Sequence, residues 1–397
     1  MSAAEGKTAS APAVPSLLLP PSQFARLQPH AYLLAHLSPP ASSNQSPIRA
    51  NGRTPLEFRP FSVNTGSLTN TNGSAVVRIG DTAAVCGVRA DILQTSDIPS
   101  WGVSSSSTAR KRRRTQDSYE DDDDDDSQIH DFNLLVPNLS LSTGCAPGFV
   151  PGAPPSALAQ SLSHKLLSLL HTSRLVRAED LRIWYQPPDL DAIEREKAEE
   201  DRDRMQTEED NAPGRPKPEI RGFWVLYIDV MMISLSGNAL DAAWAAVVAA
   251  LRDTKLPKAW WDTDNEMILC SDEVSEARTL NLRGLPVASS YSVFEADAAA
   301  GWRATVIPEA GSPMKNSDPN KPERWILADP DGFEDSLCDE RVSIVVDQDS
   351  EKSQVKIISI EKVGGISIGK DAMRELVDVS MQRWKQVKAI LEGTNKI

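Results

Sequence analysis

SAVVRIGDTAAVCGVRADI, residues 74–92, holds two runs rich in Val, Ile and Ala on either side of Gly80-Asp81. Such runs favour β-strands, and a Gly-Asp pair between them is a turn signal. The stretch therefore predicts a β-hairpin. A further strand is expected within residues 131–141, and leucines at near-helical spacing predict an amphipathic helix over residues 155–175.

The order of strands and then a helix is repeated farther along the chain. Residues 222–235, GFWVLYIDVMMISL, predict a long buried strand, and the Ala-rich residues 239–254 predict a helix. Residues 342–347 and 354–363 predict a second hairpin, and residues 371–392 predict a closing helix. Two pseudo-repeated halves, each of strands followed by a helix, predict an α+β (mixed α/β) fold.

Four segments are poor in apolar residues or rich in Pro, Ser and charge, so they cannot bury enough apolar surface to offset the entropy lost on ordering. Residues 1–21 are predicted to be a disordered tail, and residues 101–130, 187–218 and 308–322 are predicted to be low-complexity insertions. The rest, from residue 22 to residue 394, is predicted to form a single domain.

The chain is acidic, with a formal net charge of −14. A protein that binds nucleic acid without the help of partner subunits is usually basic. Any contact with RNA is therefore expected to be local or shared with other chains. The four cysteines lie far apart and form no metal-binding pair, and Cys86, Cys145 and Cys270 are expected to be buried free thiols. No signal peptide and no membrane-spanning run is recognisable, so an intracellular protein away from membranes is expected.

Five short motifs follow one another along the chain. They are RTPLEFRP at residues 53–60, GDT at 80–82, CGVRA at 86–90, GNALDAA at 237–243 and LADPDGFE at 327–334. In their order and spacing these motifs resemble the RNase PH family, and the resemblance covers residues 22–394 apart from the insertions. It implies an RNase PH-like fold.

Two further segments narrow the resemblance within the family. Residues 87–92 and 281–291 are similar to the ring subunits of the eukaryotic exosome that do not form a phosphorolytic site. The resemblance implies a scaffold that supports 3′-to-5′ RNA processing and degradation, including rRNA maturation and mRNA turnover. The implied partners are other RNase PH-like ring subunits, RNA-binding cap subunits, associated nucleases and RNA threaded through the ring. The implied locations are the nucleus, the nucleolus and the cytoplasm.

Phosphorolysis of RNA needs cationic or backbone donors for phosphate, and carboxylates for a metal ion or for acid catalysis. Active members of the family place a Gly-Thr-Arg type loop before the first long helix, but the matching residues 143–149, TGCAPGF, contain no Arg. Residues 234–238 supply no carboxylate, and Asp329 and Glu334 match a structural element of inactive subunits. No catalytic residue, cofactor or metal site is therefore predicted. An active phosphate-dependent 3′-to-5′ exoribonuclease is the alternative.

Candidate RNA contacts are three cations near the end of the first long helix, Lys165, Arg174 and Arg177, where archaeal ring subunits have an Arg-rich stretch. The alternative is that they are solvated charges that complement the C-terminal end of the helix dipole. His164 and His171 lie seven residues apart on the same predicted helix, so they share a face. With no third ligand nearby, a surface or interface pair is favoured over a metal site.

Residues 364–370, GGISIGK, fit the first part of a P-loop between a predicted strand and a predicted helix. A P-loop continues with Ser or Thr, whereas Asp371 follows here, and its charge would repel a phosphate. A helix cap at Asp371 is therefore favoured over an ATP site, which would make the chain an ATPase.

Trp260 and Trp261 follow a predicted helix end, in what is expected to be a connecting loop. Aromatic residues are enriched in the cores of protein interfaces, so this pair is a candidate interface with a partner chain. The alternative is that both rings cover the core of their own domain.

Overall fold

The computed structural model describes residues 20–39, 45–99, 101, 127–152, 154–187, 218–295, 324–338, 340–348, 354–365 and 368–394. Contacts between Cα atoms divide the chain into two compact units. The small unit is Met1–Glu57 with Val293–Leu327, and the large unit is Phe58–Ser292 with Ala328–Ile397. The single domain expected over residues 22–394 stays a prediction.

The predicted low-complexity segments fall mostly beyond what the structure describes. The tail at residues 1–21 and the insertions at 187–218 and 308–322 lie almost wholly outside the described residues. The expectation that they are disordered therefore stays a prediction.

The small unit contains two short helices, most of one strand and the last three residues of another among its described residues. Helices α1 (Pro21–Leu27) and α2 (Pro29–Leu37) each begin at a proline, whose fixed φ and missing N–H suit the first helical position. Strand β12 (Arg324–Ala328) places the Trp325 ring 6.2 Å from that of Phe294. The residues that α2 buries are Ala31, Leu33, Leu34 and Leu37.

The first sheet of the large unit has six strands. They are β1 (Phe61–Thr65), β2 (Gly73–Ile79), β3 (Thr82–Gln94), β4 (Leu135–Leu141), β5 (Arg182–Tyr185) and β6 (Glu219–Ser234). Their order is β1-β2-β3-β6-β4, and β5 also pairs with β6. All neighbours are antiparallel except β4 and β6, which are parallel. Gly80, with φ of +56°, lies in the turn of the β2–β3 hairpin, which confirms the hairpin predicted from the sequence.

One face of this sheet is covered and the other is open among the described residues. Every second residue of β6 from Leu226 to Met232 is buried, whereas Tyr227, Met231 and Ile233 are exposed. This alternation is typical of a strand that is covered on one side. Side chains on the covered face therefore form the core of the first layer.

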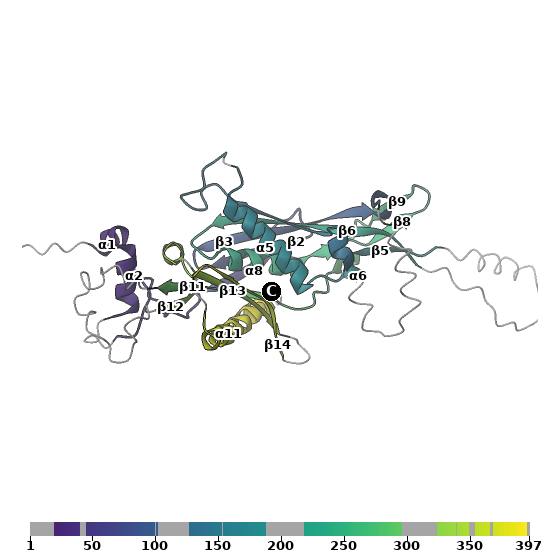
Figure 1. Ribbon diagram of the computed structural model, residues 1–397. Helices are drawn as coiled ribbons and strands as arrows, with labels where there is room; N and C mark the ends of the chain where they lie inside the picture. Colours follow the sequence, from purple (N-terminus) through teal and green to yellow (C-terminus); the bar gives the residue numbers. More distant parts are fainter. Residues whose placement is uncertain are drawn as a thin grey trace, which may run out of the picture. The chain divides into compact units, whose positions relative to one another are not determined.

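Two helices provide that cover. Helix α5 (Ala157–Ser173) packs on β4, and helix α8 (Ala239–Asp253) packs on β2 and β3 (Figure 1). α5 begins where the Ser156 side chain accepts a hydrogen bond from the backbone N–H of Ala159, an N-cap of the usual kind. α8 is buried over most of its surface, as its Ala-rich sequence allows.

The second sheet has the order β12-β11-β13-β14. Its other strands are β11 (Val287–Glu295), β13 (Glu340–Gln348) and β14 (Val355–Val363). β13 and β14 form the antiparallel hairpin predicted from the sequence. Helix α11 (Lys370–Thr394) packs on β13 and β1, and its buried stripe includes Leu376, Trp384, Val387 and Leu391.

Short elements complete the large unit. They are η2 (Thr95–Asp97), α6 (Ala178–Leu181), β7 (Lys255–Leu256), β8 (Ala259–Asp262), β9 (Met267–Cys270), η3 (Val274–Glu276), β10 (Arg278–Thr279) and α10 (Gly332–Asp335). β7 pairs with β10, and β8 pairs with β9. None of the helices that the structure describes is long and apolar enough to cross a membrane.

The position of β6 corrects one expectation from the sequence. Residues 222–235 were expected to open the second half of the chain, but β6 pairs with β3 and β4 of the first sheet. The boundary between the halves therefore falls after α8. An apolar run identifies a buried strand but not its neighbours, because pairing is decided by tertiary packing.

The edges of the predicted insertion at residues 101–130 also need correction. The Trp101 ring lies 6.0 Å from that of Phe132 and 5.5 Å from that of Phe223, and Ile129 is buried. These apolar side chains anchor both ends of the segment to the sheet. The residues between them, 102–126, lie outside the described residues.

Two smaller expectations are wrong. Cys86 and Cys145 are buried as predicted, but Cys270 is exposed at the end of β9. Strand β9 belongs to an isolated two-stranded sheet, which leaves little to cover this thiol. Helix α11 begins at Lys370, so Asp371 lies in its first turn rather than at its cap.

A buried polar network lies where the two sheets meet within the large unit. We call its members, Arg59, Thr82, Asn238, Asp241, Ser290 and Asp329, the junction. Arg59 precedes β1 and Asp329 follows β12, and their side chains form a two-pronged ion pair, with Nε–Oδ2 at 2.8 Å and Nη2–Oδ1 at 2.7 Å. Arg59 also donates from Nη1 to the Ser236 carbonyl oxygen, 2.8 Å away, at the end of β6.

Asn238 extends the network to helix α8. Its Nδ2 donates to Asp329 Oδ1 at 2.7 Å and to Asp241 Oδ2 at 2.8 Å. The Asp241 carboxylate also accepts from the backbone N–H of Ser290 at 2.9 Å and from its hydroxyl at 2.6 Å. Asn238 and Asp329 both have left-handed backbones, with φ of +49° and +47°, which Asn and Asp tolerate better than most residues. The network therefore fixes two loops in an uncommon conformation.

Burial shifts the pKa values of the two junction carboxylates and of Arg383, which lies beside the junction and donates to the Arg59 carbonyl oxygen at 3.3 Å. For Asp329 burial raises the pKa, but hydrogen bonds and charge from Arg59, with a contribution from Asn238, outweigh it and hold the pKa below its ordinary value. For Asp241 burial prevails and the pKa is raised. Burial lowers the pKa of Arg383, whose guanidinium lies 5.0 Å from the Phe58 ring. The carboxylates of Asp329 and Asp241 oppose that shift.

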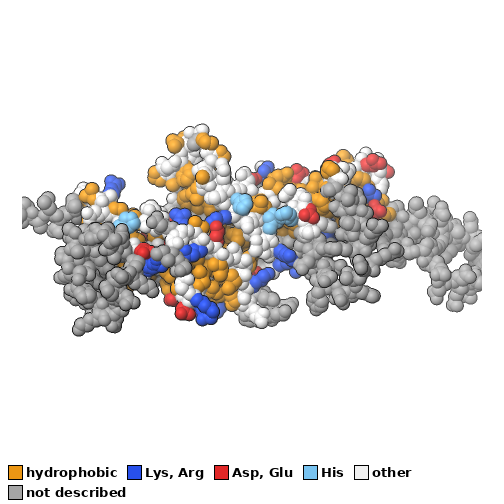
Figure 2. Space-filling model, in the orientation of Figure 1, with side chains coloured by type: hydrophobic (Ala, Val, Ile, Leu, Met, Phe, Trp, Pro, Cys, Tyr) orange, Lys and Arg blue, Asp and Glu red, His pale blue; other side chains and the backbone are white. Residues whose placement is uncertain are grey.

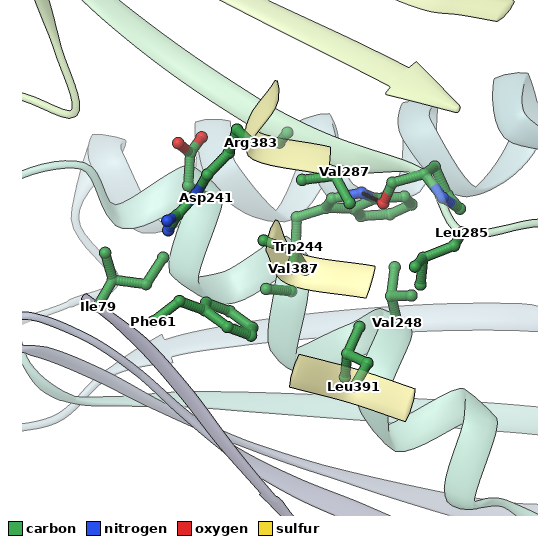
Figure 3. Close-up of a pocket in the computed structure, with 13 residues that line it drawn as sticks. Phe61, Ile79, Asp241, Trp244, Val248, Leu285, Val287, Arg383, Val387 and Leu391 are labelled. Carbon is green, nitrogen blue, oxygen red and sulfur yellow. Dashed lines mark hydrogen bonds between the residues drawn. The ribbon is translucent and has the colours of Figure 1, made fainter. Parts of the chain in front are cut away.

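A small cavity of about 20 Å³ lies beside the junction. Figure 3 shows Asp241 and Arg383 on one side of it and the Trp244 ring on the other. Trp244 is held by a 2.9 Å hydrogen bond from its Nε1 to the Pro286 carbonyl oxygen. A space of this size holds about one water molecule, so it is a gap in the core rather than a ligand site.

Replacing the carboxylate of the junction should strongly destabilise the large unit. Asp329→Asn leaves Arg59 charged and buried without its counter-ion, which we expect to cost about 3–5 kcal/mol of the free energy of unfolding in urea at neutral pH. Asp229→Asn is the matched control, because Asp229 pairs with Arg89 at 2.8 Å on the surface. Loss of that exposed pair should lower the free energy of unfolding by less than about 1 kcal/mol.

The effect of Asp329→Asn should also depend on pH. Because the folded-state pKa of Asp329 is lowered, its stabilising contribution is complete above the ordinary value of 3.8 and is lost as the pH falls below it. The difference in the free energy of unfolding between wild type and variant should therefore become smaller at acidic pH. Equal effects of Asp329→Asn and Asp229→Asn would contradict the role assigned to the junction.

Candidate functional site

The large unit contains a second cavity of about 360 Å³. It lies between α5, the loop that joins β6 to α8, and strands β11, β13 and β14. Its volume is in the range usual for sites that bind small molecules. The residues that line it are Ala146, Leu158, Ser161, Leu162, Lys165, Leu235, Gly237, Asn238, Ala239, Leu240, Ser290, Tyr291, Ser292, Pro330, Gly332, Asp335, Arg341, Ser343 and Val363.

This cavity brings together the two segments at which phosphorolytic residues were sought in the sequence. Ala146 belongs to residues 143–149, and Leu235, Gly237 and Asn238 lie in or beside the loop after β6. β4 and β6 are parallel neighbours, so their carboxyl ends meet at one edge of the sheet. A hydrogen bond of 2.9 Å from the backbone N–H of Leu235 to the Cys145 carbonyl oxygen joins the two loops.

Gly237 allows the loop after β6 to approach the loop after β12. Its φ is +77°, and a Cβ built on it would lie 2.5 Å from backbone atoms of Pro330 and Asp331. Only glycine fits this close approach without a shift of one loop. The wall of the cavity therefore depends on a residue without a side chain.

The charged side chains of the cavity are paired with one another or with its rim. Lys165 Nζ lies 3.1 Å from Glu361 Oε1, and Arg341 Nε lies 2.9 Å from Asp335 Oδ1. Burial raises the pKa of Asp335, and the charge of Arg341 opposes this. Among the described lining residues Asp335 is the one carboxylate, so the lining offers no pair of carboxylates for a metal ion.

Asp329 and Glu334, the carboxylates singled out in the sequence, do not line the cavity. Asp329 belongs to the junction. Glu334 accepts a hydrogen bond from the backbone N–H of Asp331 at 3.0 Å, and the Asp331 side chain accepts one from the backbone N–H of Glu334 at 2.9 Å. This reciprocal arrangement is a capping box that starts α10.

The three candidate RNA contacts do not lie together at the cavity. Lys165 lines it, whereas Arg174 and Arg177 are exposed beyond the end of α5. Arg174 is the C-cap of α5, with a left-handed backbone, and Arg177 precedes α6. An RNA role for any of the three stays a prediction.

The two predicted helix histidines differ in burial, because His164 is exposed and His171 is half-buried. The His171 ring lies 5.0 Å from the ring of His130, which was not singled out in the sequence. Burial lowers the pKa of His171, and the nearby His130 adds to this effect. Within the described parts of the chain, no group of three His, Cys, Asp or Glu could hold a metal ion.

The segment that resembles a P-loop lies only partly in the described structure. Residues 366 and 367 lie outside it, and the Lys362 ammonium donates to the Gly364 carbonyl oxygen at 2.6 Å. Asp371 is almost fully exposed, 3.6 Å from Arg374 one turn along α11. A carboxylate at the start of this helix does not favour a nucleotide phosphate.

Trp260 and Trp261 lie in strand β8 and not in a loop, so that expectation is wrong. Their side chains point to opposite faces of the strand, as neighbours in a strand do. Trp261 is half-buried, with the Arg221 guanidinium 5.2 Å from its ring, and Trp260 is exposed. The two residues that were considered as a pair therefore have different surroundings.

Two residues at the site gave no signal in the sequence. Arg341 and Asp335 face each other because β13 returns beside α10, and no motif marks that meeting. Asn238 and Asp241, by contrast, belong to the motif at residues 237–243. They are three residues apart at a helix start, a spacing at which side chains can meet, and Asn238 donates to Asp241 there.

Comparisons with known proteins agree with the resemblance found in the sequence motifs. Residues 57–257 match the model of the "3' exoribonuclease family, domain 1". The chain is 28% identical over 374 residues to the exosome complex component rrp43 of Schizosaccharomyces pombe, covering 94% of this chain and 98% of that protein. It is 27% identical to the exosome complex component Rrp42 of Methanothermobacter thermautotrophicus, covering 56% of this chain and 57% of the relative.

Among solved structures, the chain is similar in fold to a chain of the Archaeoglobus fulgidus exosome with RNA bound to the active site. The TM-score is 0.52 at 20% identity, and the match covers 91% of this chain and 96% of the other. The mixed helix-and-sheet fold and the family expected from the sequence are confirmed.

Gly237→Ala should damage the wall of the cavity. It combines a left-handed backbone with a Cβ that meets the loop after β12, so we expect a loss of more than about 2 kcal/mol in the free energy of unfolding in urea. Gly144→Ala is the matched control, because Gly144 has φ of +86° but nothing within 4 Å of its built Cβ. It should cost only the strain of the backbone, about 1–2 kcal/mol. An equal loss in both variants would show that the close approach at Gly237 is unimportant.

Proposed function

Because the chain belongs to the RNase PH family of 3′ exoribonucleases, we propose that it is a non-catalytic subunit of the RNA exosome core ring. Its part would be structural, as one wall of a ring that supports 3′-to-5′ RNA processing and degradation, including rRNA maturation and mRNA turnover. The similarity to an exosome component along almost the whole of both chains supports this proposal.

The observation on which the non-catalytic role rests is the composition of the large cavity. The loop at residues 143–149, which in active members provides a cation for phosphate, contributes Ala146 to the lining and contains no Arg or Lys. The cations that do line the cavity, Lys165 and Arg341, are each within 3.1 Å of a carboxylate. Phosphate would have to compete with these internal partners.

The carboxylates in and near the cavity also support the non-catalytic role. Phosphorolysis needs a carboxylate that can position a metal ion or donate a proton to the leaving oxygen. Asp335, the one carboxylate among the described lining residues, is paired with Arg341 at 2.9 Å. Asp241 and Asp329 lie near the cavity wall, but their oxygens are occupied by Arg59, Asn238 and Ser290 within the junction. These residues serve the fold.

An active phosphate-dependent 3′-to-5′ exoribonuclease remains the second candidate. One observation favours it, because Lys165 and Arg341 place two cations on one cavity of suitable size. If the pairs with Glu361 and Asp335 opened, these cations could bind phosphate. The enzyme assay described below decides between the two candidates.

The proposed partners follow from the ring. They are the other RNase PH-like subunits, RNA-binding cap subunits, associated nucleases and RNA that passes through the ring. The proposed locations are the nucleus, the nucleolus and the cytoplasm. Lys165, Arg174 and Arg177 are the proposed RNA contacts, and neither a cofactor nor a metal ion is part of the proposal.

The purified chain should not release nucleoside diphosphates from the 3′ end of single-stranded RNA when inorganic phosphate and magnesium are supplied. Chromatographic separation of the products measures this directly. The control is the double variant Lys165→Met, Arg341→Met, which removes the cations that line the cavity. Release that persists in the double variant comes from a contaminating nuclease. Release by the wild type that the double variant abolishes would show an active site and overturn the non-catalytic role.

A further inference from the structure

The hairpin of β8 and β9 carries an exposed aromatic surface on one of its two faces. Trp260 pairs with Leu269 and Asp262 pairs with Met267, and alternation along the strands places all four on the same face. The Trp260 side chain is 42% exposed and Met267 is 44% exposed. We call Trp260, Asp262, Met267 and Leu269 the outer face of the hairpin.

The opposite face of the hairpin is already occupied. Trp261 lies 5.2 Å from the Arg221 guanidinium, which is also 5.5 Å from the Tyr185 ring. Ile268 reaches so close to Gly222 of β6 that a Cβ there would meet its Cδ1. The chain thus provides its own guanidinium for one of the two adjacent indole rings, and the outer face is left exposed among the described residues.

The segment that contains the hairpin is acidic. Residues 257–276 contain six carboxylates and one lysine, and that lysine, Lys258, is paired with Glu276 at 2.7 Å. Asp262 itself accepts hydrogen bonds from the Asn265 side chain at 2.7 Å and from the Asp264 N–H at 3.1 Å. These bonds hold the pKa of Asp262 below its ordinary value, so the carboxylate beside Trp260 is charged at neutral pH. Figure 2 shows hydrophobic, acidic and basic atoms next to one another in the region of the hairpin.

An exposed indole ring beside fixed carboxylates is the chemistry that binds organic cations. The ring face attracts a guanidinium or ammonium group, and the carboxylate adds charge and a hydrogen-bond acceptor. RNA is disfavoured, because its phosphates would approach a concentration of negative charge. A second copy of this chain is disfavoured for the same reason, since the outer face would meet another acidic surface.

We infer that the outer face of the β8–β9 hairpin is a docking surface for an arginine- or lysine-bearing segment of another protein, with Trp260 as the ring that receives the cation. Trp261 stabilises the hairpin and takes no part in docking. The identification of that other protein as a component of the exosome rests on the proposed function, whereas the chemistry of the surface does not.

Fluorescence anisotropy with the full chain tests this inference. The probe is a short fluorescent peptide of alternating arginine and glycine, and oligouridylate RNA is the second probe. The peptide should bind, and binding should weaken as salt is raised. Trp260→Ala should weaken it about two- to tenfold. Asp262→Asn should weaken it in the same direction and provides a second variant if Trp260→Ala does not fold.

Trp184→Ala is the matched control. Trp184 is 47% exposed on the neighbouring strand β5, and its ring already has the Arg182 guanidinium 6.0 Å away. This variant should bind the peptide as the wild type does. The inference is overturned if the peptide does not bind, if Trp184→Ala weakens binding as much as the variants of the outer face, or if oligouridylate binds in a manner that depends on Trp260.

The proposed function can fail independently of this inference. Co-purification of the wild-type chain with other exosome ring subunits tests the proposed function and does not involve the peptide. A chain that binds the peptide through Trp260 but recovers no ring subunit would retain the docking surface and lose the exosome assignment. A chain that enters the ring but shows no Trp260-dependent peptide binding would support the exosome assignment and overturn the docking surface.

Discussion

The ion pair between Arg59 and Asp329 is the constraint on which the rest of the large unit depends. It joins Arg59, two residues before β1, to Asp329, directly after β12, and through Asn238 it extends to the start of α8. A buried arginine and a buried aspartate are each costly to remove from water, so they are tolerated only because nearly every donor and acceptor between them is matched. The network uses groups from both sheets. Loss of one partner would leave a buried charge at the point where the two sheets meet.

The same network determines what the large cavity can do. The loops after β4 and β6 meet at one edge of the sheet because those strands are parallel, and the large cavity lies at this edge. In this chain the polar side chains nearest that edge are committed to the junction or to local ion pairs. The cavity has the position and size of a small-molecule site but offers phosphate no uncommitted cation among its described lining residues. The backbone thus forms a cavity at this edge, while the polar side chains around it bond to one another and stabilise the fold.

Much of the architecture was readable from the sequence, since the β2–β3 and β13–β14 hairpins and helices α5, α8 and α11 follow from local apolar periodicity and turn residues. The position of β6 in the sheet could not be predicted, because periodicity indicates that a strand is buried but not which strands it pairs with. Trp260 and Trp261 were assigned to a loop because two strands as short as β8 and β9 leave little periodic signal. At the site, the absence of an arginine from residues 143–149 was evident in the sequence. The meeting of Arg59 with Asp329 was not, since 270 positions separate them and only the folded sheets bring them together.

The proposed function requires this chain to be a wall of the ring, and the mass of the assembled ring shows whether it is. Native mass spectrometry would be carried out on the other RNase PH-like ring subunits of the exosome, purified together with and without this chain. We expect a closed ring that contains this chain when it is present, and incomplete assemblies when it is left out. If the other subunits form a closed ring without this chain, and the chain stays free when it is added, the proposed function is wrong.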